Sequence, residues 1–186
     1  MSDQSPSLTK LREIVEKRRK YQSETTPGSD IAVDKEGRII IIEVGPDGRP
    51  LTSRPVSKVP AETFAADYYR VSNERSFVNS KMPSNTYRVD EDGIEGWMYE
   101  INTGDPYYES YTMFIYYNSG YYYVKLVDPP YAGKYSVTSC HLFNDGTLCL
   151  SSNTHGGYAS MEQAYAKSVL WAKGFSEFRR SGIFPF

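Results

Sequence analysis

Two stretches in the first half of the chain have apolar residues at the three- and four-residue spacing of an amphipathic helix. They are residues 8–20, which follow Ser7 as a candidate N-cap, and residues 61–74. The apolar positions of the first are Leu8, Leu11, Ile14 and Val15, and those of the second are Phe64, Tyr68 and Val71. Between them, an isoleucine-rich run within residues 31–56 is flanked by glycine turn signals and predicts a hairpin or a three-stranded element.

From residue 94 onward the pattern changes to short apolar and aromatic runs. Residues 94–103, 109–118 and 121–130 each read as a strand, and only short glycine-containing turns separate them. Strands joined by such short connections pair antiparallel, so the pattern predicts a meander. A final helix is expected after Ser160, which stands three residues before Gln163 in the spacing of a capping box.

Composition narrows the class of protein. The chain has 186 residues, so we expect one domain with an extension. Its 21 basic and 23 acidic residues are interspersed and its net charge is -2, which disfavours nucleic acid or a membrane surface as partner. No apolar run approaches the roughly 20 residues of a membrane helix, and the N-terminus lacks an apolar secretory segment. We therefore expect a soluble, cytoplasmic protein with two free thiols.

The motif HLFNDGTLCL, residues 141–150, concentrates the reactive side chains. Its Asp-Gly pair predicts a tight turn that enters a short strand, whose side chains then alternate between two faces. One face would carry Leu148 and Leu150. The other would carry Thr147, Cys149 and Ser151. Cysteine is among the most often buried residues, but this alternation places the sulfur on the polar face and favours chemistry over core packing.

Titratable and polar residues surround this cysteine in sequence. His141 stands eight residues before Cys149, Asn144 and Asp145 lie between them, and His155 follows. Histidine and aspartate are general acid–base groups, so Asp145 and His155 are candidates for taking a proton. Each also has a simpler interpretation: Asn144 and Asp145 as turn residues and His155 as a loop histidine beside two glycines.

Two other kinds of site use the same residue types. Cys140, His141, Cys149 and His155 are all acceptable zinc ligands, but they lack the close cysteine pairs of structural zinc sites. A cysteine peptidase commonly places its nucleophile at a helix N-terminus, whereas Cys149 follows a turn and a strand. We therefore expect no metal and no cofactor, and we interpret Cys140 as a small buried residue.

The meander, the proline pair Pro129-Pro130, the motif and the following helix together resemble the ubiquitin-conjugating enzymes. The resemblance covers roughly residues 94–178 and is most specific at DGTLCL, where Cys149 takes the position of that family's nucleophile. It is nearest to bacterial members of ubiquitin-like conjugation and antiphage defence systems. It implies an α+β fold in which an antiparallel meander sheet packs on helices.

The same resemblance implies a division of the chain and a reaction. Residues 1–57 would form an N-terminal helix and hairpin extension, and residues 58–186 the catalytic domain. An activating enzyme would load a ubiquitin-like modifier onto Cys149 as a thioester, and an amine of a protein acceptor, a lysine by expectation, would then take it. The alternative is a binding module or scaffold that has this fold and an inactive cysteine.

The motif departs from the family at one position. Eukaryotic relatives have a His-Pro-Asn triplet whose asparagine stands eight residues before the cysteine, where this chain has His141. That asparagine is thought to steady the loop or the oxyanion of the attacked thioester. A neutral histidine also has one N–H to donate, so the resemblance implies a comparable role for His141.

Overall fold

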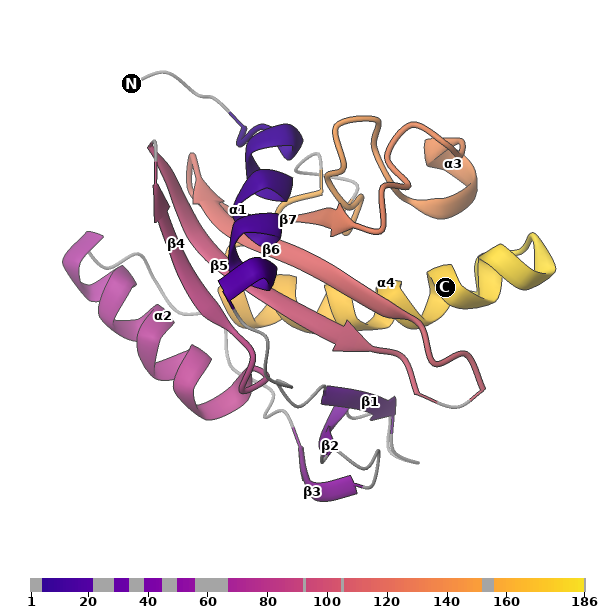
Figure 1. The fold of residues 1–186 in the computed structure, drawn as a ribbon, viewed down its shortest axis with the longest axis horizontal. Coiled ribbons are helices and arrows are strands. Elements are labelled where there is room, and N and C mark those ends of the chain that lie inside the picture. Colours follow the sequence, from indigo (N-terminus) through magenta and orange to yellow (C-terminus); the bar gives the residue numbers. More distant parts are fainter. Residues whose placement is uncertain are drawn as a thin grey trace.

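The computed structural model describes residues 5–21, 29–33, 39–44, 50–55, 67–91, 93–104, 106–151 and 156–185. Its centre is an antiparallel meander of four consecutive strands (Figure 1). These strands are β4 (Tyr87–Glu91), β5 (Ile94–Asn102), β6 (Ser110–Asn118) and β7 (Tyr121–Asp128). The predicted meander of three strands is confirmed, with β4 added before it.

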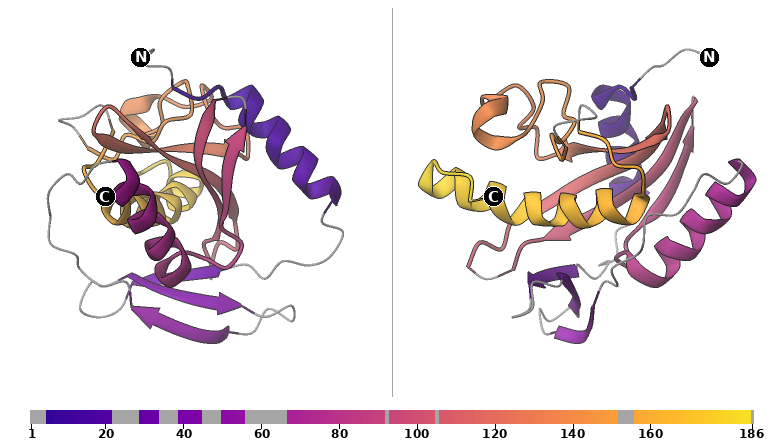
Figure 2. Two further views of the ribbon diagram at one scale, coloured as in Figure 1. Left: turned by 90° about the vertical axis from the view of Figure 1, so that its left-hand side faces the viewer. Right: turned by 180° about the vertical axis from the view of Figure 1, so that it is seen from behind.

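Helices cover both faces of this meander. α1 (Leu8–Tyr21) lies on one face, and α4 (Met161–Ser181) lies on the other (Figure 2). α2 (Asp67–Lys81) lies beside the meander, where Val78 joins the main core. The molecule is therefore an α+β protein, as expected, with the sheet between helical layers. No helix among the described residues is long and apolar enough to cross a membrane.

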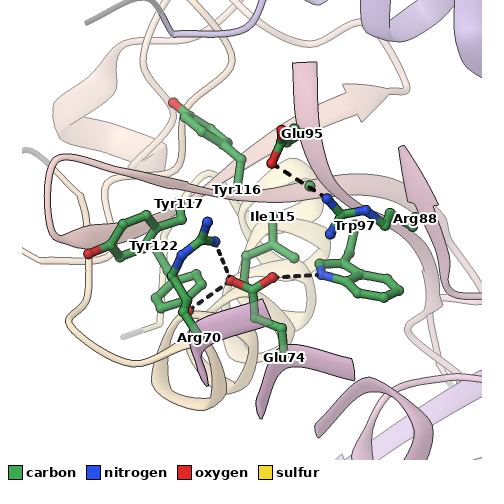
Figure 3. A pocket seen from close by; sticks show the side chains of 10 residues that line it. Arg70, Glu74, Arg88, Glu95, Trp97, Ile115, Tyr116, Tyr117 and Tyr122 are labelled. Carbon is green, nitrogen blue, oxygen red and sulfur yellow. Dashed lines mark hydrogen bonds and ion pairs between the residues drawn. The ribbon is translucent and has the colours of Figure 1, made fainter. Parts of the chain in front are cut away.

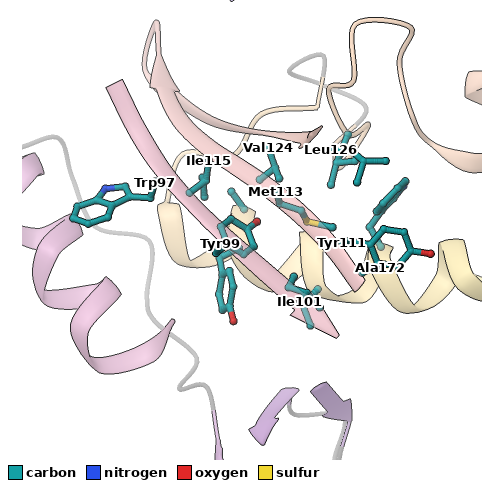
Figure 4. Close-up of a cluster of buried hydrophobic side chains, with 14 of the residues drawn as sticks. Trp97, Tyr99, Ile101, Tyr111, Met113, Ile115, Val124, Leu126 and Ala172 are labelled. Carbon is teal, nitrogen blue, oxygen red and sulfur yellow. The ribbon is translucent and has the colours of Figure 1, made fainter. Parts of the chain in front are cut away.

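Strand alternation divides the meander side chains between two cores. The larger core lies under α4 and takes side chains such as Tyr99, Met113 and Val124 from β5, β6 and β7 (Figure 4). The smaller core lies under α1, where Leu11 and Val15 are buried. Its strand residues are Val89, Ile94, Met98, Phe114, Tyr116 and Val127. The apolar face predicted for residues 8–20 is thus the face that α1 buries.

Three further strands form a small antiparallel element. They are β1 (Ser29–Val33), β2 (Ile39–Val44) and β3 (Pro50–Pro55), paired β1 to β2 and β2 to β3. β1 also makes one parallel pairing with β5, between Asp30 and Asn102. The expected three-stranded element is confirmed. The expected boundary between extension and catalytic domain, near residue 57, lies outside the described residues.

The start of α4 agrees with the prediction from the sequence, whereas the range of α2 differs from it. α4 begins as expected, because Ser160 Oγ accepts a hydrogen bond from the Gln163 N–H at 3.1 Å. α2 was predicted over residues 61–74, but the described helix is Asp67–Lys81, and residues 61–66 lie outside the described part. The C-terminal boundary was wrong because Phe77 and Val78 continue the apolar stripe onto the main core.

Candidate functional site

The motif of residues 141–150 folds back on itself as a tight turn beyond β7 (orange in Figure 1). The Gly146 N–H donates to the Phe143 carbonyl at 2.9 Å, and the Phe143 N–H donates to the Thr147 carbonyl at 2.8 Å. Gly146 has a φ of 84°, a left-handed conformation that glycine adopts at little cost. The predicted Asp-Gly turn is therefore confirmed.

The segment after the turn is shorter and less regular than a strand. Leu148 is fully buried and bridges Leu142, as the alternation predicts. Regular pairing stops there, because the Leu150 N–H donates to the Leu148 carbonyl only two residues back. Thr147 is 6% exposed, and its hydroxyl donates to Asp145 Oδ2. Cys149 itself is partly exposed, as its position predicts.

His141 lies directly opposite Cys149 across the turn. The Cys149 N–H donates to the His141 carbonyl at 2.8 Å, immediately beyond the buried pair of Leu142 and Leu148. Both side chains are partly exposed. The motif thus joins the backbone of the candidate nucleophile to that of the candidate oxyanion donor.

The backbone of His141 is in an uncommon conformation. It caps the short helix α3 (Val137–Cys140), with φ 55° and ψ 37° in the left-handed region, and its N–H donates to the Val137 carbonyl at 2.8 Å. Outside glycine, this region is used mainly by asparagine, aspartate and histidine. A left-handed residue is a common way for a helix to end, so this conformation fixes where the chain leaves α3 and enters the motif.

The two cysteines have different surroundings. Cys140 is completely buried, its thiol donates to the Ser136 carbonyl at 3.3 Å, and its own carbonyl accepts from the Trp171 indole at 2.9 Å. Its interpretation as a small buried residue is confirmed. Partial burial raises the pKa of the Cys149 thiol above its ordinary value, and burial also raises the pKa of Cys140. Both thiols are therefore largely protonated at neutral pH.

The hydrogen bonds of Asp145 stabilise the turn. Its Oδ1 accepts from the Thr147 N–H at 3.0 Å and its Oδ2 from the Thr147 hydroxyl at 2.8 Å. The Lys125 ammonium donates to Asp145 Oδ2 at 2.7 Å and to the Asp145 carbonyl at 2.8 Å. Partial burial opposes ionisation of Asp145, but the bonds from Lys125 and Thr147 outweigh it and hold its pKa below the usual range. These contacts favour the turn interpretation of Asp145.

Lys125 is a site residue that the sequence interpretation missed. It lies on β7, is only 1% exposed, and projects toward the α1 side of the sheet opposite Phe114. The neighbouring β7 residues add two backbone bonds to the motif, because the Leu126 N–H donates to the Gly146 carbonyl and the Leu148 N–H to the Val124 carbonyl. A lysine inside an apolar strand was the available signal.

The remaining predicted site residues are Asn144 and His155. Asn144 is exposed in the turn. His155 lies outside the described residues, so its proposed part in proton transfer stays a prediction. Among the described residues, no three histidine, cysteine or carboxylate side chains gather as metal ligands would.

A second polar cluster lies away from the motif, between α2 and the sheet (Figure 3). The Glu74 side chain is 5% exposed and accepts hydrogen bonds from Arg70, Trp97 and Tyr122 at 2.6, 3.2 and 2.9 Å. The adjoining cavity is about 30 Å³, room for a single water. Because its carboxylate is fully partnered, we interpret Glu74 as a structural tie between α2 and the meander.

Comparisons with protein-family models, with curated proteins and with solved structures give no match for this chain.

Proposed function

We propose that the protein is a conjugating enzyme of the ubiquitin-conjugating fold that carries a ubiquitin-like modifier as a thioester on Cys149. The observation that carries the proposal is the contrast within one motif. Cys149 is partly exposed opposite His141, whereas Cys140, nine residues earlier, is completely buried. The meander, the cysteine turn and the long helix α4 follow one another in the order of that family.

Loading is an exchange between two thioesters. The Cys149 thiolate attacks the acyl carbon that joins the modifier to the activating enzyme's thiol, a new C–S bond forms, and the activating enzyme's thiolate leaves. A sulfur nucleophile suits this step because a thiolate both attacks and leaves readily. The raised pKa of Cys149 means that the thiol must lose its proton before it attacks.

Transfer to the acceptor breaks the bond that loading made. A neutral amine attacks the thioester carbon, a C–N bond forms, the Cys149 thiolate leaves, and the nitrogen releases a proton. Negative charge develops on the carbonyl oxygen in the tetrahedral intermediate. An imidazole N–H of His141 is the side-chain donor we propose for this oxyanion, since its backbone is bonded to that of Cys149.

The test is adduct formation with matched cysteine variants. The protein is incubated with ATP, an activating enzyme and a ubiquitin-like protein from the same genome, and adducts are resolved with and without reductant. We expect a reductant-sensitive adduct with the wild type and with Cys140→Ala, and none with Cys149→Ala. An adduct lost with Cys140→Ala but kept with Cys149→Ala would refute the assignment. If no adduct forms and a mild thiol probe labels both cysteines equally fast, the protein is a binding module instead.

A further inference from the structure

The chain turns sharply at the end of α4. Gly182 has a φ of 77°, and its N–H donates to the Phe178 carbonyl at 2.8 Å. The Ser181 hydroxyl donates to the Glu177 carbonyl at 3.0 Å and accepts from the Ile183 N–H at 3.1 Å. The Gly182 cap and the two hydrogen bonds of the Ser181 hydroxyl together turn the chain back at the end of the helix.

The turn separates the next two apolar side chains. Ile183 is 71% exposed, whereas Phe184 is partly buried and packs against the main core. The Phe184 ring meets the imidazole of His141 edge to face, with ring centroids 5.1 Å apart and planes at 60°. The turn therefore directs one specific side chain onto the candidate site.

The His141 imidazole has an aromatic neighbour in Phe184. Within the described part of the chain, the structure gives the His141 side chain no hydrogen bond, and its ring contact is with Phe184. An aromatic edge contact prefers one geometry, so it limits the rotamers that the imidazole samples. A donor that must meet an oxyanion acts best when it is already oriented.

We propose that Phe184 is a positioning residue that orients the His141 imidazole for the transfer step. This role rests on the proposed function. The ring contact of Phe184 is with His141, which acts in transfer, so we assign the effect of Phe184 to transfer and not to the exchange between thioesters. It acts when the amine attacks, by keeping the His141 N–H directed toward the developing oxyanion.

The test separates loading from transfer in single-turnover reactions with defined probes. Cys149 is acylated with acetyl-Gly-Gly supplied as its 2-mercaptoethanesulfonate thioester, and transfer to free lysine is then followed by mass spectrometry. We expect Phe184→Ala to slow transfer by about three- to tenfold and to leave acylation unchanged. Phe184→Tyr keeps a ring and should restore the rate, and Ile183→Ala is the matched control on the exposed neighbour.

Two further measurements distinguish positioning from general support of the fold. In a His141→Ala background, Phe184→Ala should have no additional effect on transfer. In the folded protein, the ring-proton NMR signals of His141 should shift in Phe184→Ala and stay near their wild-type positions in Phe184→Tyr. An unchanged transfer rate in Phe184→Ala, or an equal loss without His141, overturns this role and leaves the proposed function standing. Failure of wild-type Cys149 to accept the acyl group counts against the proposed function itself.

Discussion

Lys125 is buried and Asp145 is half-exposed, so we predict that replacing Asp145 destabilises the fold more than replacing Lys125. Lys125 is 2% exposed at its side chain, whereas Asp145 is 53% exposed. Replacing Asp145 with asparagine removes the negative charge and leaves the buried ammonium with neutral acceptors, the backbone carbonyl of residue 145 and at most one amide oxygen. Replacing Lys125 with methionine leaves a carboxylate that water and Thr147 can still solvate.

The magnitudes follow from these exposures. Breaking a fully buried ion pair costs about 3–5 kcal/mol, and water beside the half-exposed Asp145 reduces this, so we expect about 2 kcal/mol for Asp145→Asn. Lys125→Met fills a similar volume and removes the ammonium that must be desolvated, so we expect a loss below about 1 kcal/mol. The double variant should be more stable than Asp145→Asn alone.

The assay is chemical denaturation at neutral pH, supported by thermal melts. A loss of about 2 kcal/mol should lower the melting temperature by ~4–8 °C in a protein of this size. Asn144→Ala is the matched control, since Asn144 is the exposed neighbour in the same turn and should change stability by less than about 0.5 kcal/mol. If Lys125→Met costs more than Asp145→Asn, the reasoning about the unpaired charge is wrong.

Three more predictions follow from the site. Gly156 has a φ of 97°, and a Cβ there would lie 2.3 Å from the Leu148 carbonyl oxygen and 3.4 Å from Cys149 Cα, so Gly156→Ala should cost about 1–3 kcal/mol in melts and slow acylation of Cys149. Because burial raises the pKa of Cys149, the rate of its acylation should still be rising at pH 8, by about tenfold per unit below the pKa; a plateau below pH 7 would contradict this. The lowered pKa of Asp145 stabilises the fold above its unfolded-state value of about 3.9, and this contribution is lost as the pH falls through the folded value. The stability difference between wild type and Asp145→Asn should therefore shrink as the pH falls below the unfolded-state pKa of about 3.9 in acid titrations followed by circular dichroism.

Periodicity in the sequence was sufficient to predict the meander and the apolar face of α1. Tyr99, Met113 and Val124 point to one face and Met98 and Phe114 to the other because a strand alternates regardless of its tertiary partners. The same rule was insufficient after Leu148. There the backbone conformation depends on contacts with β7 and on the close approach of Gly156. The alternation of apolar and polar residues does not contain either of these contacts.

The same distinction applies to the site residues: contacts within the motif could be predicted from the sequence, and contacts between distant segments could not. His141 and Cys149 lie within one turn of ten residues, so their proximity could be predicted from the motif. Lys125 acts through Asp145, 20 residues later, and Phe184 reaches His141 only because Gly182 reverses the chain. Contacts of this kind depend on the tertiary fold, and single-sequence periodicity contains no information about them.

The raised pKa of Cys149 favours a carrier of acyl groups over a hydrolase. A peptidase cysteine gains from a lowered pKa, supplied by a helix N-terminus or a neighbouring cation, because it must attack an unactivated amide. Cys149 follows a turn, and among the described residues burial raises the pKa of its thiol, which disfavours the thiolate. A thiol that accepts an acyl group from an already activated thioester does not need such a lowered pKa. An oriented amine beside His141 can then compete with water for the acyl group, which is the balance that transfer to an acceptor requires.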